Sequence, residues 1–286
     1  MLYWGDPRYH PVRRIRHALL LLALAVLAAG AAAQSAGKSE GVEVGKPSEL
    51  RRLVPADRLE QAATQQYTAL LRQAAAKGAL APDDHPQLVR LRAIGKRVIA
   101  QAARFNPQAA KWKWEINLIG SNQINAFCMP GGKIAFFTGI LDRLKLTDDE
   151  VAAIMGHEVA HALLEHARER VAKSELTRLG VTIAAILAGD ARYADAFNLG
   201  GALLSLKFSR DDETEADLVG LELAARAGFD PRAGVTLWQK MGAASKGAPP
   251  QWLSTHPAGS NRIKEIERQL PAVMPLYERS RAAAGR

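Results

Sequence analysis

Apolar residues recur with helical spacing in two segments of the first half of the chain. From Pro55 to about Ala75 the apolar positions lie three or four residues apart, and the same spacing returns between about Pro86 and Ala103. This periodicity places apolar side chains on one face of a helix. We therefore expect two amphipathic helices here, packed on the core of the protein.

Between Trp112 and Leu141 the spacing changes to alternation, which is typical of strands. Three short strands are expected, at residues 112–118, 123–129 and 133–138. Turn residues at 130–132 separate the last two, so these strands should form a hairpin. Strand patterns cease after them. The predicted fold class is α+β, mostly helical, with a small antiparallel sheet.

Two later helices carry clear start signals. Thr147 and Glu150 have the spacing of a capping box, and an apolar-periodic run begins at Val151. A second helix should begin near Ser209, because three acidic residues follow in its first turn, and it should end at Gly228. Most of the candidate site residues lie on these two helices.

The first 33 residues have the pattern of an export signal. Arginines cluster at positions 13–16, an apolar stretch runs from Ala18 to Gly30, and small residues lead up to Ala33. We expect a signal peptide over residues 1–33, cleaved near Ala33, then a flexible linker over residues 34–50 and a periplasmic mature protein. The apolar run is about 16 residues long against the roughly 20 that span a bilayer, so an uncleaved anchor is the less favoured alternative.

Charge and cysteine content exclude some classes of protein. The formal charge is +9, but four basic residues and one acidic residue precede position 34, so about +6 remains and is spread along the chain. A nucleic-acid surface would show clustered Lys and Arg with interleaved aromatics. The sequence has no such cluster, so nucleic-acid binding is not expected. The single cysteine, Cys128, cannot form an intramolecular disulfide and is expected to be a small buried residue.

The sequence from His157 to His161 has the composition of a zinc site. The two histidines are four positions apart, so on a helix both rings project from one face and can reach one ion. Glu158 is rotated by about 100° from His157, beside the ion, where its carboxylate can accept a proton from water. Two surface histidines are the alternative. The capped helix and its apolar residues around the motif argue against that alternative.

A third ligand should come from another element, because a catalytic zinc ion has three protein ligands and an open position. Glu213 is the best candidate, on the helix that begins near Ser209. Asp217 is one turn further along and could hydrogen-bond a ligand histidine. Glu215 is the competing candidate, and an exposed acidic residue is its other interpretation. We expect one Zn²⁺ per chain.

These motifs together resemble metallopeptidase family forty-eight, a gluzincin group that includes the HtpX, BepA and LoiP peptidases and the CAAX prenyl proteases. The resemblance covers roughly residues 85–270 and implies a zincin-type domain with zinc ligands His157, His161 and Glu213 and with Glu158 as general base and acid. The residues that carry it are Gly156-His157-Glu158-Val159-Ala160-His161, Glu213-Thr214-Glu215-Ala216-Asp217, Thr255-His256-Pro257 with Arg262, Asn125-Ala126-Phe127 and Pro130-Gly131-Gly132.

The resemblance also implies roles for residues outside the ligand set. Asn125 and Ala126 would lie on an exposed edge strand to which a polypeptide substrate pairs as an added strand. His256 and Arg262 would lie in a loop near the metal. Arg262 could stabilise the oxyanion, and His256 could do the same or act as a fourth ligand that holds the enzyme latent.

We expect residues 51–286 to form a zinc metallopeptidase domain, with N-terminal helices at 55–105 and a catalytic core at 110–270. The expected function is hydrolysis of peptide bonds in unfolded or misassembled envelope proteins. Prenylated substrates are not expected, and neither is a topology with multiple membrane helices. The alternatives are an envelope chaperone or adaptor with a latent zinc site and a membrane-surface binding protein. The apolar region from Leu176 to Leu206 motivates the second alternative, but is expected to be a buried or lid-like insert. Peripheral membrane contact stays open, and no oligomeric state is predicted.

Overall fold

The computed structural model describes residues 40–45, 47–187, 203, 206–245, 250–256 and 261–285. The predicted signal peptide and Pro257 lie outside the described residues. From Gly41 onwards the chain forms one unit. Helices dominate it, as the predicted fold class requires.

The sheet has three strands, β1 (Glu115–Ile119), β2 (Ala126–Met129) and β3 (Lys133–Phe137), in the order β1-β3-β2. The predicted hairpin is confirmed, because β2 and β3 pair antiparallel. β1 pairs parallel to β3, so the sheet is mixed and the prediction of a wholly antiparallel sheet is corrected. The physical reason is that β3 is buried along its whole length and takes the central position, where both faces are covered.

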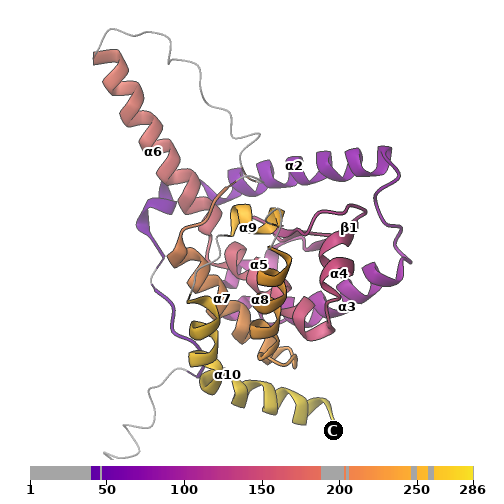
Figure 1. Ribbon diagram of the computed structural model, residues 1–286. Coiled ribbons are helices and arrows are strands. Elements are labelled where there is room, and N and C mark those ends of the chain that lie inside the picture. The colour runs from indigo at the N-terminus through magenta and orange to yellow at the C-terminus, as the bar shows by residue number, and fades with distance from the viewer. Residues whose placement is uncertain are drawn as a thin grey trace, which may run out of the picture. The chain divides into compact units, whose positions relative to one another are not determined.

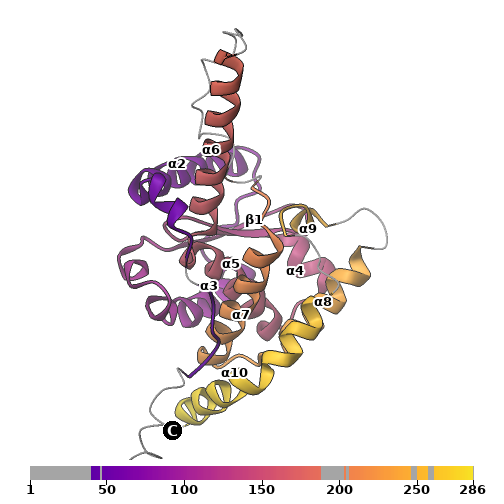
Figure 2. The ribbon, with the colours of Figure 1, turned by 90° about the vertical axis from the view of Figure 1, so that its left-hand side faces the viewer.

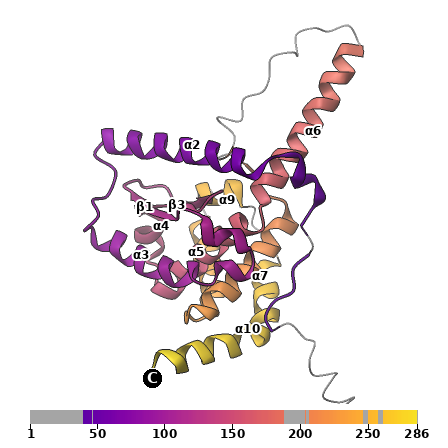
Figure 3. The same cartoon turned by 180° about the vertical axis from the view of Figure 1, so that it is seen from behind.

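Helices cover both faces of the sheet (Figure 3). α2 (Ala56–Ala76) packs on one face, where Ala135 and Phe137 of β3 join its core cluster. α3 (Pro86–Ile99) and α5 (Asp148–Leu163) contribute to the cluster on the other face, with Ile134 and Phe136. The alternation of these four β3 residues between two clusters follows from the two-residue period of a strand. The sheet is thereby fixed directly beside α5.

α5 begins where the sequence predicts. The Thr147 hydroxyl accepts a hydrogen bond from the Glu150 amide at 3.3 Å, and the Glu150 carboxylate accepts one from the Thr147 amide at 2.8 Å. This capping box satisfies backbone donors that a helix start leaves unpaired. Lys240 adds an ion pair to Glu150 at 2.6 Å. The start of the helix that carries the histidines is therefore held from two directions.

α7 (Arg210–Arg226) crosses α5 in direct backbone contact (Figure 1). The contact lies at two glycines: a Cβ atom on Gly220 would come within 2.6 Å of the His157 nitrogen, and one on Gly156 within 2.5 Å of the Gly220 oxygen. Only residues without side chains permit this approach. The crossing brings the acidic residues of α7 next to the histidines of α5.

The remaining helices surround this pair. α8 (Ala233–Ala244) and α10 (Arg262–Ala284) pack on each other, and α10 also packs on α7. None of the described helices is both long enough and apolar enough to cross a membrane. The other elements of the described chain are η1 (Glu49–Leu53), η2 (Ala102–Arg104), η3 (Pro107–Lys111), α4 (Thr138–Leu144), α6 (His166–Leu187) and α9 (Gln251–Thr255).

Residues 41–45, which belong to the linker predicted over residues 34–50, contact α7. The Val42 amide donates a hydrogen bond to Glu222 at 2.7 Å, and the Gly45 amide donates one to Glu215 at 3.1 Å. Both acceptors belong to α7, and Val42 and Val44 pack against the main core. This segment, which we call the N-terminal strap, therefore lies along α7 (Figure 2).

Candidate active site

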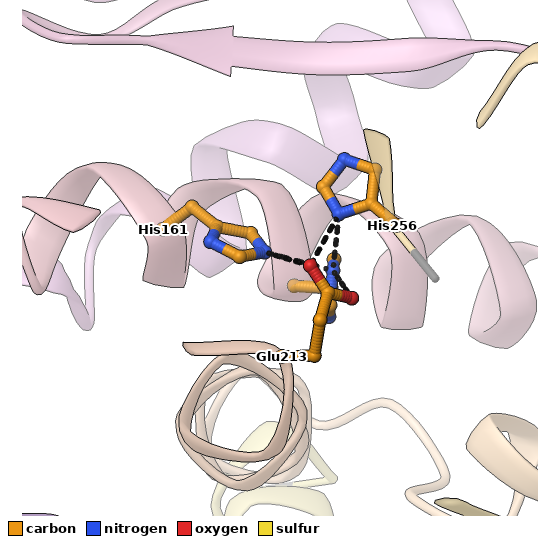
Figure 4. A group of neighbouring side chains, drawn as sticks. His161, Glu213 and His256 are labelled. Atoms are coloured by element: carbon orange, nitrogen blue, oxygen red, sulfur yellow. Dashed lines mark hydrogen bonds and ion pairs between the residues drawn. The ribbon is translucent and has the colours of Figure 1, made fainter. Parts of the chain in front are cut away.

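Four buried side chains from three parts of the chain converge on one point. His157 and His161 come from α5, Glu213 from α7, and His256 from the residue after α9. One ligand atom from each lies within 4.8 Å of those of the other three. Figure 4 shows the rings of His161 and His256 both pointing toward the Glu213 carboxylate. The sequence predicted the first three as a ligand set.

The geometry of these atoms fits a tetrahedral zinc ion. Donor atoms at about 2.0–2.1 Å from such an ion lie about 3.3–3.4 Å from one another. The two Nε2 atoms of His157 and His161 are 3.1 Å apart, and Glu213 oxygens lie 3.6 Å and 3.3 Å from them, respectively. Two imidazole nitrogens and a carboxylate are also ligands that zinc accepts. The residues present fit the metal.

The protonation states of the set suit metal binding. Burial alone would raise the pKa of Glu213, but hydrogen bonds from His161 and His256 outweigh it and hold this pKa far below its usual range. Burial, reinforced by the neighbouring His157, holds the pKa of His161 well below its usual value. Since metals bind ionised carboxylates and neutral imidazoles, both directions favour the charge states that metal binding needs.

Asp217 and Arg262 stand behind His157. The Asp217 carboxylate lies 3.0 Å from His157 Nδ1, so it fixes the ring with Nε2 toward the other ligands. Arg262 donates to Asp217 from Nε and Nη2 and to Glu213 from Nη1, each at 2.6 Å. These donors of Arg262 are directed at the two carboxylates and can orient them, and its expected oxyanion role stays a prediction.

Glu158 lies beside the group, and its carboxylate is held by a residue that sequence reasoning missed. Trp252 of α9 donates from its indole Nε1 to Glu158 Oε1 at 2.6 Å. The same indole stacks on the His256 ring, with centroids 4.9 Å apart. A sequence signal exists, since Trp252 precedes His256 by four positions, one helical turn. Burial of Trp252 to 1% exposure makes this contact rigid.

His256 takes the position that a fourth ligand would occupy. Its Nδ1 lies 3.2 Å from His157 Nε2 and 3.0 Å from Glu213 Oε1, and its Nε2 lies 3.5 Å from Glu158. Phe208, from the segment before α7, contacts the same group, since its ring stacks on His161 with centroids 4.0 Å apart. In this arrangement the aromatic side chains close the site around the converging atoms.

Glu215 does not join the ligand group. Its Oε2 lies 3.3 Å from His166 Nε2, and its Oε1 accepts the Gly45 amide of the N-terminal strap. Neither interpretation of Glu215 made from the sequence describes this contact, since the side chain is about one third exposed and bonded on both oxygens. His166 in turn contacts His161. The sequence analysis gave His166 no role.

The two predicted substrate-binding residues lie at the sheet edge. Among the described strands β2 pairs with β3 alone, which leaves its other side as an edge. Asn125 and Ala126 line a cavity of about 560 Å³ that also reaches α2 and Thr255, the residue before His256. Cys128 of β2 is partly buried and lines a smaller cavity beside His161 and His256, and burial raises the pKa of its thiol. The two cavities are neighbours, since Phe127 and Thr255 line both.

A sheet edge above a helix with paired histidines, a glutamate beside them and an acidic residue from a later helix defines the zincin class of metallopeptidases. Comparison with known families then gives the particular family. The profile of Peptidase family M48 matches residues 87–270, and the chain belongs to that family. Residues 87–270 therefore form a peptidase domain of this family.

Three relatives illustrate the range of this similarity. The mitochondrial metalloendopeptidase OMA1 of Schizosaccharomyces pombe is 38% identical over 201 residues, which cover 70% of this chain and 58% of the relative. The metalloprotease LoiP of Escherichia coli is 27% identical, over 68% of this chain and 75% of its own. The β-barrel assembly-enhancing protease of Yersinia pestis is 27% identical, over 64% and 38%, respectively. The chain spans little more than half the length of the OMA1 relative.

Proposed function

We propose that the protein is a zinc-dependent endopeptidase in which His157, His161 and Glu213 hold the metal and Glu158 is the catalytic base and acid. The observation that carries this proposal is the Glu158 carboxylate beside a buried set of two imidazoles and an ionised carboxylate. Bound zinc supplies a Lewis acid and brings the pKa of its water ligand to about 7. The remaining chemistry belongs to residues of the chain.

Glu158 would accept a proton from the attacking water and return it to the leaving amine. Trp252 donates to one carboxylate oxygen, so this oxygen is held and the other is left for proton transfer. Arg262 and Asp217 fix Glu213 and His157 through hydrogen bonds of 2.6–3.0 Å, and the ligand geometry therefore does not depend on the metal alone. This rigidity supports a preorganised catalytic site.

Replacing Glu158 tests the mechanism. Glu158→Gln keeps the shape and the Trp252 contact but removes the base, so the rate on unfolded casein should fall about 10²- to 10⁴-fold. Zinc content, measured on the same purified protein, should be unchanged. Asp211→Asn, at an exposed position in the first turn of α7, is the charge-matched control. A Glu158→Gln variant that cleaves at the normal rate would show that another group is the base.

We further propose that His256 holds the resting enzyme closed as a fourth ligand. Its Nδ1 lies 3.2 Å from His157 Nε2 and 3.0 Å from Glu213 Oε1, within reach of an ion that these residues would hold, so His256 would have to withdraw before a substrate carbonyl could enter. The alternative is that His256 stabilises the oxyanion. Only the first role predicts that losing the ring helps catalysis.

His256→Ala separates these two roles. If His256 closes the site, its removal should raise the casein rate by up to the inverse of the open fraction, about tenfold if one tenth of the molecules is open. If it stabilises the oxyanion, the rate should instead fall by about 10²-fold. Zinc affinity, measured alongside by chelator competition, should decrease in the first case because a ligand is lost.

The substrates that this site would accept are extended polypeptides. A chain added to the edge of β2 would gain backbone hydrogen bonds whatever its side chains, which favours unfolded or misassembled proteins. The cavity at Asn125 and Ala126 has room for several side chains and continues to Thr255. A folded substrate would have to open before it could pair in this way.

We place this activity in the cell envelope, after cleavage of the signal near Ala33. The export pattern of the first 33 residues motivates this assignment, and one relative is named for β-barrel assembly. Expression of the full-length chain, fractionation and N-terminal mass determination test it. A mature chain that begins at Gln34 in the periplasmic fraction is expected, and an intact N-terminus in the cytoplasm would contradict it.

A further inference from the structure

The second ring nitrogen of each paired histidine has a different partner. For His157 the partner is the Asp217 carboxylate. A carboxylate is a usual hydrogen-bond partner for the second ring nitrogen of a histidine that binds a metal. For His161 it is another imidazole: His161 Nδ1 lies 2.9 Å from Nδ1 of His166. His166 is 2% exposed and is the first residue of α6. An imidazole nitrogen thus stands where a carboxylate is usual.

Only one arrangement of protons satisfies this contact when His161 presents its Nε2 lone pair to a metal. His161 must then carry its proton on Nδ1 and donate it to His166 Nδ1. His166 must accept there and carry its own proton on Nε2. That nitrogen lies 3.3 Å from Glu215 Oε2, an acceptor. Every donor therefore faces an acceptor along the line from His161 to Glu215.

The N-terminal strap completes this line. The second oxygen of Glu215, Oε1, accepts the backbone amide of Gly45 at 3.1 Å. The strap is held a second time by Glu222, seven residues further along α7, through the amide of Val42. Because Glu222 is 2% exposed and also pairs with Arg226 at 2.6 Å, this second anchor is fixed. The strap therefore positions Glu215 from outside the ligand group.

The backbone between α5 and α6 shows how His166 reaches this place. His166 follows His161 by five positions, so on a continuous helix the two side chains would diverge by about 140°. Glu165 interrupts the helix with a left-handed backbone, φ 57°. A residue other than glycine costs free energy there, and ion pairs from Arg51 and Arg168 hold it. The turn directs His166 back onto His161.

We propose that His166 and Glu215 are positioning residues for the zinc ligand His161. The Gly45 amide of the N-terminal strap completes this chain of hydrogen bonds from His161 through His166 to Glu215, which we call the relay. The inference rests on the proposed ligand set. It extends the metal centre to a segment outside the region matched by the family profile, which begins at residue 87. Zinc affinity and ligand orientation should then depend on residues that never touch the ion.

The test measures zinc affinity by competition with a chromophoric chelator, using the whole mature chain. His166→Ala should weaken zinc binding by about 10- to 100-fold, the usual effect of losing the partner of a ligand histidine. His166→Asn should recover most of the loss, because its amide oxygen can accept from His161 Nδ1. Glu215→Ala should weaken binding by about tenfold, and Glu215→Gln, whose single amide oxygen keeps one of the two accepting contacts, by less.

Two further measurements separate positioning from a general structural effect. Cobalt-substituted His166→Ala should show a shifted visible spectrum, because the His161 ring is free to turn, whereas Asp211→Asn should match the wild type. Thermal unfolding in the presence of a chelator shows whether the variants fold. Folded His166→Ala and His166→Asn proteins with wild-type zinc affinity and spectrum would overturn the proposal.

The strap is tested by Gly45→Pro, which removes the amide donor, beside Gly45→Ala, which keeps the donor but shares the new Cβ contact at 2.7 Å from Glu215 Oε1. Zinc affinity should fall by less than in Glu215→Ala, and unchanged affinity would remove the strap from the relay. Glu213→Gln separates this inference from the proposed function. If Glu213→Gln loses zinc and the His166 variants do not, only the relay is wrong. If Glu213→Gln keeps its zinc, the ligand set is wrong.

Discussion

At the scale of single residues, the candidate site consists of converging groups and the groups that hold them. Glu158 is held by Trp252, His157 by Asp217, and Glu213 by Arg262. Each holder is at least nine-tenths buried, so the side chains have little freedom to turn. Precise placement of this kind matters because a small displacement of a catalytic group can cost a large factor in rate.

Trp252→Phe isolates one of these holding contacts. The phenyl ring can keep the stacking on His256 but cannot donate to Glu158. A hydrogen bond to a charged group contributes about 1.5–3 kcal/mol, so kcat should fall about 10- to 100-fold. KM and zinc content should change little.

Trp114→Phe is the matched control, because its indole donates to the Ala109 carbonyl, away from the metal group. Steady-state kinetics on one peptide substrate serve for both proteins. Equal kcat in Trp252→Phe and wild type would show that Glu158 does not need this donor.

At the scale of elements, the crossing of α5 and α7 decides whether a site exists at all. Capping boxes start both helices at defined residues, Thr147 and Ser209. The glycines at 156 and 220 then allow the backbones to touch. The start of each helix fixes which residues reach the crossing, and the glycines fix the distance between them. Together they place Glu213 opposite His157 and His161.

Gly220→Ala should separate the two helices. Its methyl group would come within 2.6 Å of the His157 backbone, where neither helix can yield cheaply. Overpacking of this kind costs about 1–3 kcal/mol of unfolding free energy, and zinc affinity should fall with it. Urea unfolding and chelator competition measure the two effects.

Gly242→Ala is the control for the same substitution in a helix. A Cβ atom at Gly242 of α8 would meet nothing within 4 Å. Replacing a helical glycine by alanine there should stabilise the protein by about 0.5–1 kcal/mol. If Gly220→Ala and Gly242→Ala change the free energy of unfolding by the same amount, the close approach at Gly220 does not determine the effect of the added methyl group.

At the scale of the whole molecule, the metal group joins parts of the chain that are far apart in sequence. Its four residues come from α5, from α7 and from the end of α9, and Arg262 links them to α10. An ion held there binds the folded chain and finds no such arrangement in the unfolded one. Metal binding should therefore stabilise the fold as well as enable catalysis.

Removal of zinc should lower the thermal stability. At a free zinc concentration about 1,000 times the dissociation constant, binding stabilises by about 4 kcal/mol. For a domain of this size each kcal/mol shifts Tm by about 2–4 °C, so a chelator should lower Tm by about 8–16 °C. In Glu213→Gln the chelator should have little effect. An equal shift in that variant would place the stabilising ion elsewhere.

Much of the fold could be predicted from the sequence because its signals are local. Periodicity gave α2 and α3 within a few residues, and the capping-box spacing gave the start of α5. The turn residues at 130–132 gave the hairpin of β2 and β3. The parallel pairing of β1 could not be found in this way, since strand order depends on which strand both layers of helices cover.

The sequence by itself determined the chemistry of this protein: two histidines one helical turn apart, a glutamate between them and acidic residues on a later capped helix. These follow from spacing along single helices. Only the tertiary structure decided what holds those groups. Trp252, His166 and the strap at Gly45 reach the site through turns and contacts between distant segments, and Arg262 is drawn to Asp217 and Glu213 by their buried charge. Such partners are set by packing in three dimensions, which no local pattern specifies.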